Sequence, residues 1–531
     1  MGRKSCEARA ARDPEKLARM MEAVKVVLSG VGELDLARPG ILDTPKRVAK
    51  AFLDMTECAQ QEPKDVIGEA LFQEPAVAGG SNGMVLVRSI DFSAMCRHTL
   101  MPFVGRAHVA YLPSAQGVVV GLSKVARIVR SLSKRPQTQA DLARGIVEAL
   151  DAIGARGTAV LLSARHLSQG ADAGRSQRLE LRTSGAFRES SALRLEFLAL
   201  LRLHGVQCAA QVDASGPQHS AVAAVAARRD GKAAGHGGSA ADLANSECSD
   251  LSDAAPASAG SLYRATAQRP LSGEATEVTE EMDTDSASAG TASASGACAP
   301  APPWDVADAH GHLAPRCPGV TRAAMEGAVA VLLREAGLWP AGDGDGSGWG
   351  EGEAGAACRR HVSLLLAGTR GYETEVPRAC GGGTALGCGA ADMGWPRAAG
   401  GQSARREVFE PAVAFQSLCE HHMLPFYGTV RVGYASRPGA PALPWAELRG
   451  LVDALSRRLQ VQERLGEQLA DAVAAAADAE GVMVAIDSAH MCMVCRGVER
   501  TGSSTVTVAS RGVYLEDSAL RLSAMASLFD R

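Results

Sequence analysis

The sequence predicts an α+β protein made of two copies of one domain. Its 531 residues exceed the roughly 150 that one domain usually holds. An internal repeat accounts for the excess: the segment that ends at Gly105 matches the segment that ends at Gly428, so Cys96 aligns with Cys419. Within each copy, strand-like and helical patterns follow one another in an order typical of one antiparallel sheet with helices on one face.

The copies occupy residues 17–205 and 319–531, and a linker is expected at 206–318. After Leu203, Ala, Ser, Gly and Asp predominate and large apolar residues are scarce, which is typical of a disordered segment. Two Gly-rich stretches, 341–357 and 379–401, are expected to be surface insertions. Because there are only two copies, the repeat indicates a tandem duplication and not a solenoid.

The order of elements follows from hydrophobic spacing and turn residues. In the first copy, helices are expected at Leu17–Leu28 and Pro45–Met55, with Thr44 as the cap and Pro45 at the first helical position. The remaining elements expected there are strands at Met84–Val87, Gly105–Leu112 and Thr158–Ser163, and helices at Ser123–Ser133 and Gln139–Ile153. The second copy repeats them as Phe426–Tyr434, Ala446–Arg458, Glu463–Ala477 and Val482–Ile486.

Composition excludes several classes of protein. The net charge is -4, so neither nucleic acid nor an anionic membrane is an expected partner. No window reaches about 18 consecutive apolar residues and the N-terminus has no apolar signal core, so a cytoplasmic protein is expected. The 13 cysteines are odd in number and thinly spread, which does not suit a disulfide framework.

One cluster in the second copy predicts a metal site. Cys419 and His422 lie three residues apart before a strand, and Cys492 follows another strand. Three such ligands suit zinc and leave a fourth position for water, the arrangement of a catalytic site. His421 and His490 lie beside them as candidate acids or bases. A closed structural zinc site that uses one of these histidines, and buried cysteines without metal, remain alternatives.

The first copy lacks this cluster, since Thr99 and Ser168 stand where the second has His422 and Cys492. It carries instead a hydroxyl and two cations near a helix start, an arrangement that can receive an anion, although a solvated basic helix face would look the same. These residues are Ser123, Lys124 and Arg127, and the second copy has Ala446, Glu447 and Gly450 there.

A further acidic residue, Glu463, has Ala140 as its counterpart in the first copy. Each copy is therefore equipped where the other is deficient, which simple decay of one duplicate would not require.

Together, the motifs Cys-Glu-His-His, Gly-Leu-Ser-Lys-x-x-Arg, Gln-Val-Gln-Glu-Arg and His-x-Cys-Met-x-x-Arg-Gly resemble GTP cyclohydrolase I, in particular its tandem two-domain form of plants and algae. The resemblance runs from about Met20 to Phe197 and from about Ala324 to the C-terminus. It implies the tunnelling fold (T-fold), in which domains of a homo-oligomer join into a barrel with active sites between neighbours. It also implies that GTP is converted to 7,8-dihydroneopterin triphosphate and formate, the entry to tetrahydrofolate.

The resemblance also implies roles for individual residues. Cys419, His422 and Cys492 correspond to the zinc ligands, His490 to the proton donor with His421 as its partner, and Ser123 to the residue that contacts the ribose. The residues that correspond to substrate binders are Glu463 for guanine, Gln462 beside it, and Lys124, Arg127, Arg496, Arg47 and Lys50 for the triphosphate.

Because each set of residues occurs in one copy only, we expect a composite active site between an N-terminal and a C-terminal domain. Three alternatives remain. In the first, the C-terminal domain alone is the catalyst and the N-terminal domain is a regulatory pseudo-domain. In the second, the protein binds zinc or a purine nucleotide without catalysis, and in the third it is a related enzyme that acts on a pterin or deazapurine.

Overall fold

The structure is a computed structural model of the chain. It describes residues 13–58, 71–73, 83–168, 177–206, 278–279, 313–339, 350–376, 406–440, 442–498 and 500–529. Most of the expected linker 206–318 and all of the expected insertion 379–401 lie outside the described residues.

The N-terminal half contains a mostly antiparallel sheet in the order β5-β2-β3-β6-β7-β8, in which the end pairs β2–β5 and β7–β8 are parallel. Its strands are β2 (Val85–Cys96), β3 (Pro102–Leu112), β5 (Pro136–Gln137), β6 (Gly157–His166), β7 (Arg178–Thr183) and β8 (Val278–Thr279). A small separate sheet pairs β1 (Leu71–Gln73) with β4 (Val118–Val120). The helices are α2 (Pro14–Gly30), α3 (Thr44–Met55), α5 (Leu122–Leu132), α6 (Gln139–Asp151), α7 (Gly185–Glu189) and α8 (Ser191–Leu203).

The C-terminal half repeats this plan in the order β12-β10-β11-β13-β14, with β9 pairing with β11 beside that path. Its strands are β9 (Arg406–Phe409), β10 (Val413–Cys419), β11 (Pro425–Ser436), β12 (Leu459–Gln460), β13 (Ala479–His490) and β14 (Thr505–Gly512). Its helices are α12 (Arg322–Glu335), α13 (Glu351–Gly368), the 3-10 helix η4 (Arg370–Glu373), α14 (Trp445–Ser456), α15 (Gln462–Ala476), α16 (Met491–Val494), α17 (Val513–Glu516) and α18 (Ser518–Phe529).

The internal repeat is confirmed by side chains that make the same bond in both copies. The Tyr111 hydroxyl accepts from the Val120 N–H at 2.9 Å, and the Tyr434 hydroxyl accepts from the Leu443 N–H at 2.9 Å. Each bond fixes the central strand to the segment before α5 or α14. Two copies therefore share one architecture, and a residue of one can be compared with its counterpart in the other.

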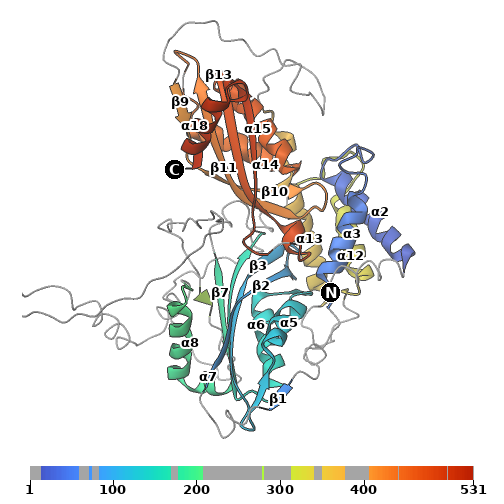
Figure 1. The fold of residues 1–531 in the computed structure, drawn as a ribbon. Helices are drawn as coiled ribbons and strands as arrows, with labels where there is room; N and C mark the ends of the chain where they lie inside the picture. The colour runs from blue at the N-terminus through green and yellow to red at the C-terminus, as the bar shows by residue number, and fades with distance from the viewer. Residues whose placement is uncertain are drawn as a thin grey trace, which may run out of the picture.

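The expectation of helices on one face is wrong, because both faces of each sheet are covered. In the N-terminal sheet, alternate residues such as Val109 and Leu162 pack under α5 and α6, while Ala110 and Leu161 pack under α8. In the C-terminal sheet, α17 and α18 likewise cover the face opposite α14 and α15 (Figure 1). Strand residues alternate between the faces, and here both sets are apolar, so each face needs a cover.

A bundle of four helices joins the two halves. α2, α3, α12 and α13 lie beside the junction of the two sheets (Figure 1), and their apolar side chains form one core with strands of the C-terminal half. Fully buried members come from both halves, among them Met20, Met325 and Phe426. The largest core of the described residues therefore belongs to neither half alone.

Two local expectations are corrected here. Residues 351–357 begin α13 and do not form a surface insertion: Ala354 and Ala357 are buried, and small residues allow this close packing. Thr44 is not the cap of α3, since Asp43 occupies that position and the Thr44 hydroxyl donates to the Glu420 carbonyl at 2.9 Å. In both cases a contact with a distant segment of the chain accompanies the local structure.

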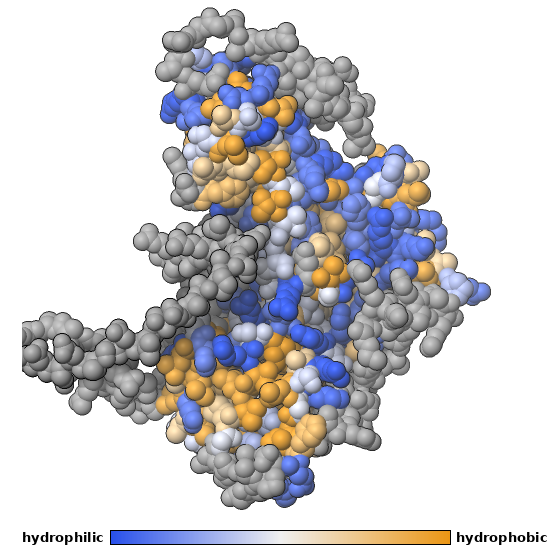
Figure 2. All heavy atoms as spheres, in the orientation of Figure 1, coloured by the Kyte–Doolittle hydropathy of each residue, from blue (hydrophilic) through white to orange (hydrophobic). Residues whose placement is uncertain are grey.

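None of the described helices combines the length and apolar character needed to cross a bilayer. Apolar residues nevertheless gather on the visible surface of the N-terminal half, over the strands and α8 (Figure 2). Leu203 at the end of α8 is 80% exposed, and Val506 on the terminal strand β14 is 52% exposed. Both sheets thus carry apolar surface at or near an edge.

Candidate active site

The hairpin between β10 and β11 brings Cys419 and His422 together. Cys419 is the last residue of β10, and its N–H and carbonyl bond to Leu424 and Met423 at 2.9 and 2.8 Å, which closes a tight turn. Met423 adopts a φ of 52°, an unusual value for a residue with a side chain, and its counterpart Leu100 has a φ of 54°. Both copies build the same turn, which places the first and fourth residues on one side.

Cys492 completes a cluster that can hold a metal ion. It lies on α16, two residues after the end of β13, and β13 pairs with β11 so that Phe426 faces His490. The possible ligand atoms of Cys419, His422 and Cys492 all lie within 4.8 Å of one another. Within the described residues, one group of three or more Cys, His or acidic side chains has its possible ligand atoms this close together, and it is this one.

The donor atoms fit a metal. Nδ1 of His422 is buried and has no hydrogen-bond partner among the described residues, as expected for an atom that a metal ion would satisfy. The pKa of the Cys419 thiol lies far below its ordinary value, since Cys492 and the neighbouring histidines hydrogen-bond to its thiolate. A thiolate is the form in which cysteine binds metals. The expected cluster is thus brought together by the fold.

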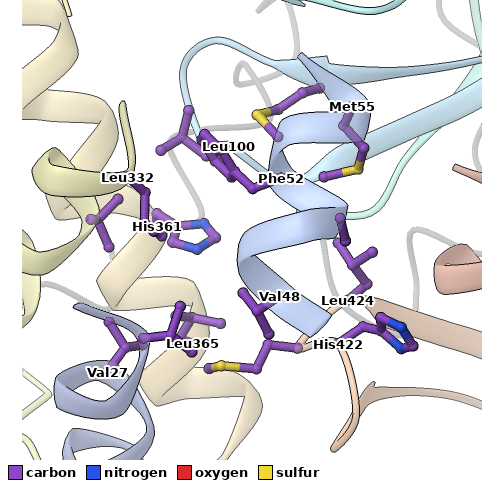
Figure 3. A pocket seen from close by; sticks show the side chains of 15 residues that line it. Val27, Val48, Phe52, Met55, Leu100, Leu332, His361, Leu365, His422 and Leu424 are labelled. Atoms are coloured by element: carbon purple, nitrogen blue, oxygen red, sulfur yellow. The ribbon is translucent and has the colours of Figure 1, made fainter. Parts of the chain in front are cut away.

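An apolar cavity lies behind His422. Its volume is about 50 Å³, and its lining comes mostly from the helices α2, α3, α12 and α13 and from the segments that join β2 to β3 and β10 to β11. Figure 3 shows His422 at one side of it and His361 at the other, with Val48 and Phe52 from α3 between them. Such surroundings exclude bulk water from one side of the cluster, which strengthens electrostatic interactions within it.

His490 is held in a fixed orientation beside the cluster. Its ring stacks on Phe426 with the ring centroids 4.7 Å apart, and its Nε2 lies 2.7 Å from Oε1 of Gln462. The Gln462 amide donates in turn to the carbonyl oxygens of Ile486 and Thr505 at 3.0 and 2.9 Å. Because Gln462 is anchored to two strands, its oxygen fixes which way the imidazole faces. Sequence spacing alone did not reveal this supporting role.

His421 lies on the open side of the cluster and is 37% exposed. A hydrogen bond to the Cys419 thiolate raises its pKa, and burial opposes this. The nearby guanidinium of Arg47 also lowers that pKa, so α3 of the N-terminal half reaches the cluster of the C-terminal half. His421 is therefore the more accessible of the two candidate proton carriers.

Two of the predicted triphosphate contacts lie beside the cluster and a third is close by. Arg496 places Nη1 2.9 Å from Nε2 of His422, and its guanidinium lies 4.0 Å from the carboxylate of Asp54 on α3. Arg47 also lies on α3, where it pairs with Asp43 at 3.2 Å, and Lys50 follows one turn later. One chain thus supplies cations to this site from both of its halves.

The other predicted anion-binding residues lie elsewhere. Ser123 and Lys124 begin α5, next to β4, at the edge of the N-terminal half that is farthest from the C-terminal half (Figure 1). The opposite end of α5 is the one near the cluster, since Lys134 Nζ donates to the Cys495 carbonyl at 2.9 Å. Eleven helical residues separate these ends by roughly 15 Å. Arg127 is exposed on the same helix.

Glu463 lies in the first turn of α15, next to Gln462, and its side chain is exposed. In the described chain, no apolar wall buries this carboxylate. A pocket that encloses this carboxylate therefore needs a surface that one chain does not provide in this arrangement.

The equivalent place in the first copy keeps the scaffold without the ligands. His166 stacks on Phe103 at 4.8 Å and lies 3.1 Å from Oε1 of Gln139, as His490 does with Phe426 and Gln462. Thr99 and Ser168 replace two of the ligands, and burial lowers the pKa of His166 to about 3. This copy therefore retains the fold of the site but not its donor set.

Comparison with known proteins agrees with this geometry. The family model of GTP cyclohydrolase I matches residues 20–202 and 398–528, hence both halves. The chain is 26% identical to GTP cyclohydrolase 1 of Solanum lycopersicum over 97% of this chain and 93% of that protein. It is 43% identical to GTP cyclohydrolase 1 1 of Pseudomonas putida over 180 residues, 33% of this chain and 90% of that protein.

A further relative, GTP cyclohydrolase 1 of Coxiella burnetii, is 41% identical over 34% of this chain and 95% of that protein. The bacterial proteins thus match a single copy, whereas the tomato protein matches nearly the whole chain. On this evidence the chain belongs to the GTP cyclohydrolase I family of enzymes, in the tandem form that carries two copies of the domain.

Proposed function

We propose that the protein is a zinc-dependent hydrolase that converts GTP and water to 7,8-dihydroneopterin triphosphate and formate. The observation that carries this proposal is the cluster of Cys419, His422 and Cys492, with His421 and His490 beside it, in a chain of this family. Two thiolates and an imidazole are ligands that suit zinc, and three protein ligands leave a position for water. Held by Cys419, His422 and Cys492, a zinc ion would lower the pKa of a water and so supply the nucleophile that attack at C8 of the purine requires.

Side chains of the protein donate the proton that the reaction needs and exchange it with solvent. Attack at C8 requires protonation of N7, because the neutral imidazole ring resists addition. His490, fixed by Gln462 and stacked on Phe426, is positioned to donate that proton, and the more exposed His421 can exchange it with solvent. Glu463 provides a carboxylate for the N1–H and N2–H donors of guanine, and adenine would leave it without partners.

We further propose that each active site takes parts from three domains. The C-terminal half contributes the metal cluster, the two histidines, Glu463 and Arg496. The N-terminal half that is docked on it contributes Arg47 and Lys50 from α3. Ser123, Lys124 and Arg127 lie at the far end of their domain, so they complete the site of another copy of the chain. The exposure of Glu463 supports this, since its pocket lacks a wall.

Such an arrangement requires a homo-oligomer. The exposed Val506 and Val508 on the terminal strand β14 are suited to burial against a neighbouring domain, as is the apolar surface around α8. Closing sheets of several domains into a barrel would cover both edges. Size measurement by light scattering would find an assembly of several chains.

A direct assay tests the proposed reaction. Full-length protein is expected to bind about one zinc ion per chain and to release formate from GTP, and Cys492→Ser should lose both properties while keeping its circular dichroism spectrum. Cys495→Ser, a matched change one turn away, should keep its zinc. Formate release without metal, or a zinc-loaded protein that releases no formate, would contradict the proposal. The second result would favour a binding protein.

A further inference from the structure

Two ion pairs occupy equivalent positions in the two copies but with opposite polarity. In the second copy, Arg464 Nη2 donates to the Glu420 carboxylate at 2.7 Å. In the first, Arg97 lies 3.4 Å from the carboxylate of Asp141. The repeat aligns Glu420 with Arg97 and Arg464 with Asp141. Each pair connects the cysteine-bearing turn to the first turn of α6 or α15, so the turn is acidic in one copy and basic in the other.

The acidic turn is matched by one cation of the N-terminal half, Arg38. Arg38 Nη2 donates to Glu420 at 3.0 Å and to Glu33 at 2.6 Å, and the side chains of Glu420 and Arg38 are only 3% and 13% exposed. Gly40 packs so tightly on the Glu420 carboxylate that a methyl group there would collide with it. Thr44 then donates to the Glu420 carbonyl. Residues 38–44 are thus fitted to the acidic turn.

The reverse contact pairs the basic turn with an acidic helix start. α13 of the C-terminal half lies on the turn of the N-terminal half, where His361 Nδ1 bonds the Thr99 carbonyl at 3.0 Å. The first turn of α13 carries Glu351 and Glu353. Burial and the neighbouring Arg97 lower the pKa of His98 in the basic turn; of the charges on α13, Glu353 opposes that effect and Arg360 adds to it. Arg38 thus pairs directly with the acidic turn, and the acidic first turn of α13 lies near the basic turn.

We propose that this inverted polarity determines which domains pair, so that an N-terminal domain docks on a C-terminal domain and not on another N-terminal one. Two N-terminal domains docked in this way would bring Arg38 onto Arg97. Two C-terminal domains would bring the acidic start of α13 onto Glu420. Like charges in such a buried contact are strongly unfavourable, whereas the apolar bundle beside it would accept either partner.

The polar contact determines which domain docks, and the apolar bundle does not. This proposal concerns assembly, so it holds whether or not the proposed reaction occurs. The domain that binds each turn is the complementary domain of this chain, either of the same molecule or of a second one. The inversion also separates two roles of the turn: Cys419 and His422 face the metal site, while Glu420 faces the other domain.

The test uses the full chain with a protease recognition sequence inserted after Asp250, cut after purification. Exchange of labelled for unlabelled halves, followed by fluorescence energy transfer, measures how fast the halves separate. Arg38→Glu should accelerate separation at least about 30-fold, the lower range for losing one partner of a buried charge pair. Lys25→Glu, which makes the same charge change at an exposed pair within α2, should leave the rate unchanged.

Reversal of the partner charges should restore pairing. Glu420→Arg with Arg464→Asp gives the C-terminal copy the polarity of the first copy, and these two changes alone should also accelerate separation. Combined with Arg38→Glu, they should return the rate to within a fewfold of wild type. An unchanged rate in Arg38→Glu, or a combined variant that separates as fast as its parents, would overturn the proposal. The readout is separation of the halves, so loss of GTP turnover does not affect it.

Discussion

Two inactive full-length variants should restore activity to each other when they share an oligomer. Lys124→Ala removes a cation of the proposed triphosphate site, and Cys492→Ser removes a ligand of the metal cluster. These residues belong to opposite halves, and α5 places Lys124 at its far end from the cluster of its own chain. If each site draws its cluster from one chain and Lys124 from another, a mixed oligomer contains some sites with both parts intact.

The expected size of the effect follows from random assembly. In an equal mixture, a site works only when its cluster comes from the Lys124→Ala chain and its lysine from the Cys492→Ser chain, which gives about one quarter of wild-type activity per site. If both parts came from the same chain, the mixture would stay as inactive as its parents. Wild type mixed with the double variant gives a second estimate: about one quarter for sites shared between chains, but about one half for sites within one chain.

The assay is formate release from GTP by co-expressed variants that carry different tags and are purified through both. Tandem purification establishes that the oligomers are mixed, so absence of activity cannot reflect separate assembly. A doubly tagged mixture with no activity above its parents would refute the shared site. So would one half of wild-type activity in the second mixture.

Two further predictions concern single residues. Burial lowers the pKa of His108 to about 4, below the roughly 6.5 of an unfolded chain, so the neutral ring contributes about 3 kcal/mol that is present above pH 6.5 and lost as the pH falls to 4. His108→Asn keeps an acceptor for the Ser89 N–H, so urea unfolding should depend less on pH in this range than in wild type; equal dependence would contradict the reasoning. Glu463→Gln should lower kcat/KM for GTP by roughly 10- to 100-fold with unchanged zinc content, and unaltered kinetics would exclude its role in guanine binding.

Much of the fold could be predicted because its signals are local. Alternating apolar residues marked the strands, and the repeated Tyr111 and Tyr434 recur because each bonds the backbone that follows its strand. The cluster of Cys419, His422 and Cys492 was likewise visible, since a tight turn and a strand end fix those residues regardless of the rest of the chain. Such features depend on neighbours within a few residues or on one adjacent strand.

What sequence reasoning missed depends on contacts between distant segments. The start of α13 looked like a Gly-rich insertion, yet it packs in the bundle that joins the halves. The charge reversal from Glu420 to Arg97 could be read in the aligned copies, but its meaning required Arg38, which lies far away in the chain and follows no recognisable motif. A single sequence shows which residues are charged, but not which of them contact one another.

The charged contact at Glu420 and Arg97 is related to what each copy lacks. A site that needs a metal cluster from one kind of domain and a cation set from the other is useless wherever two domains of the same kind meet. A covalent linker supplies equal numbers of both kinds, but it cannot prevent like from pairing with like. Inverted polarity at Glu420 and Arg97 provides that discrimination at the turn that carries the cluster, so correct docking also brings Arg47 to His421.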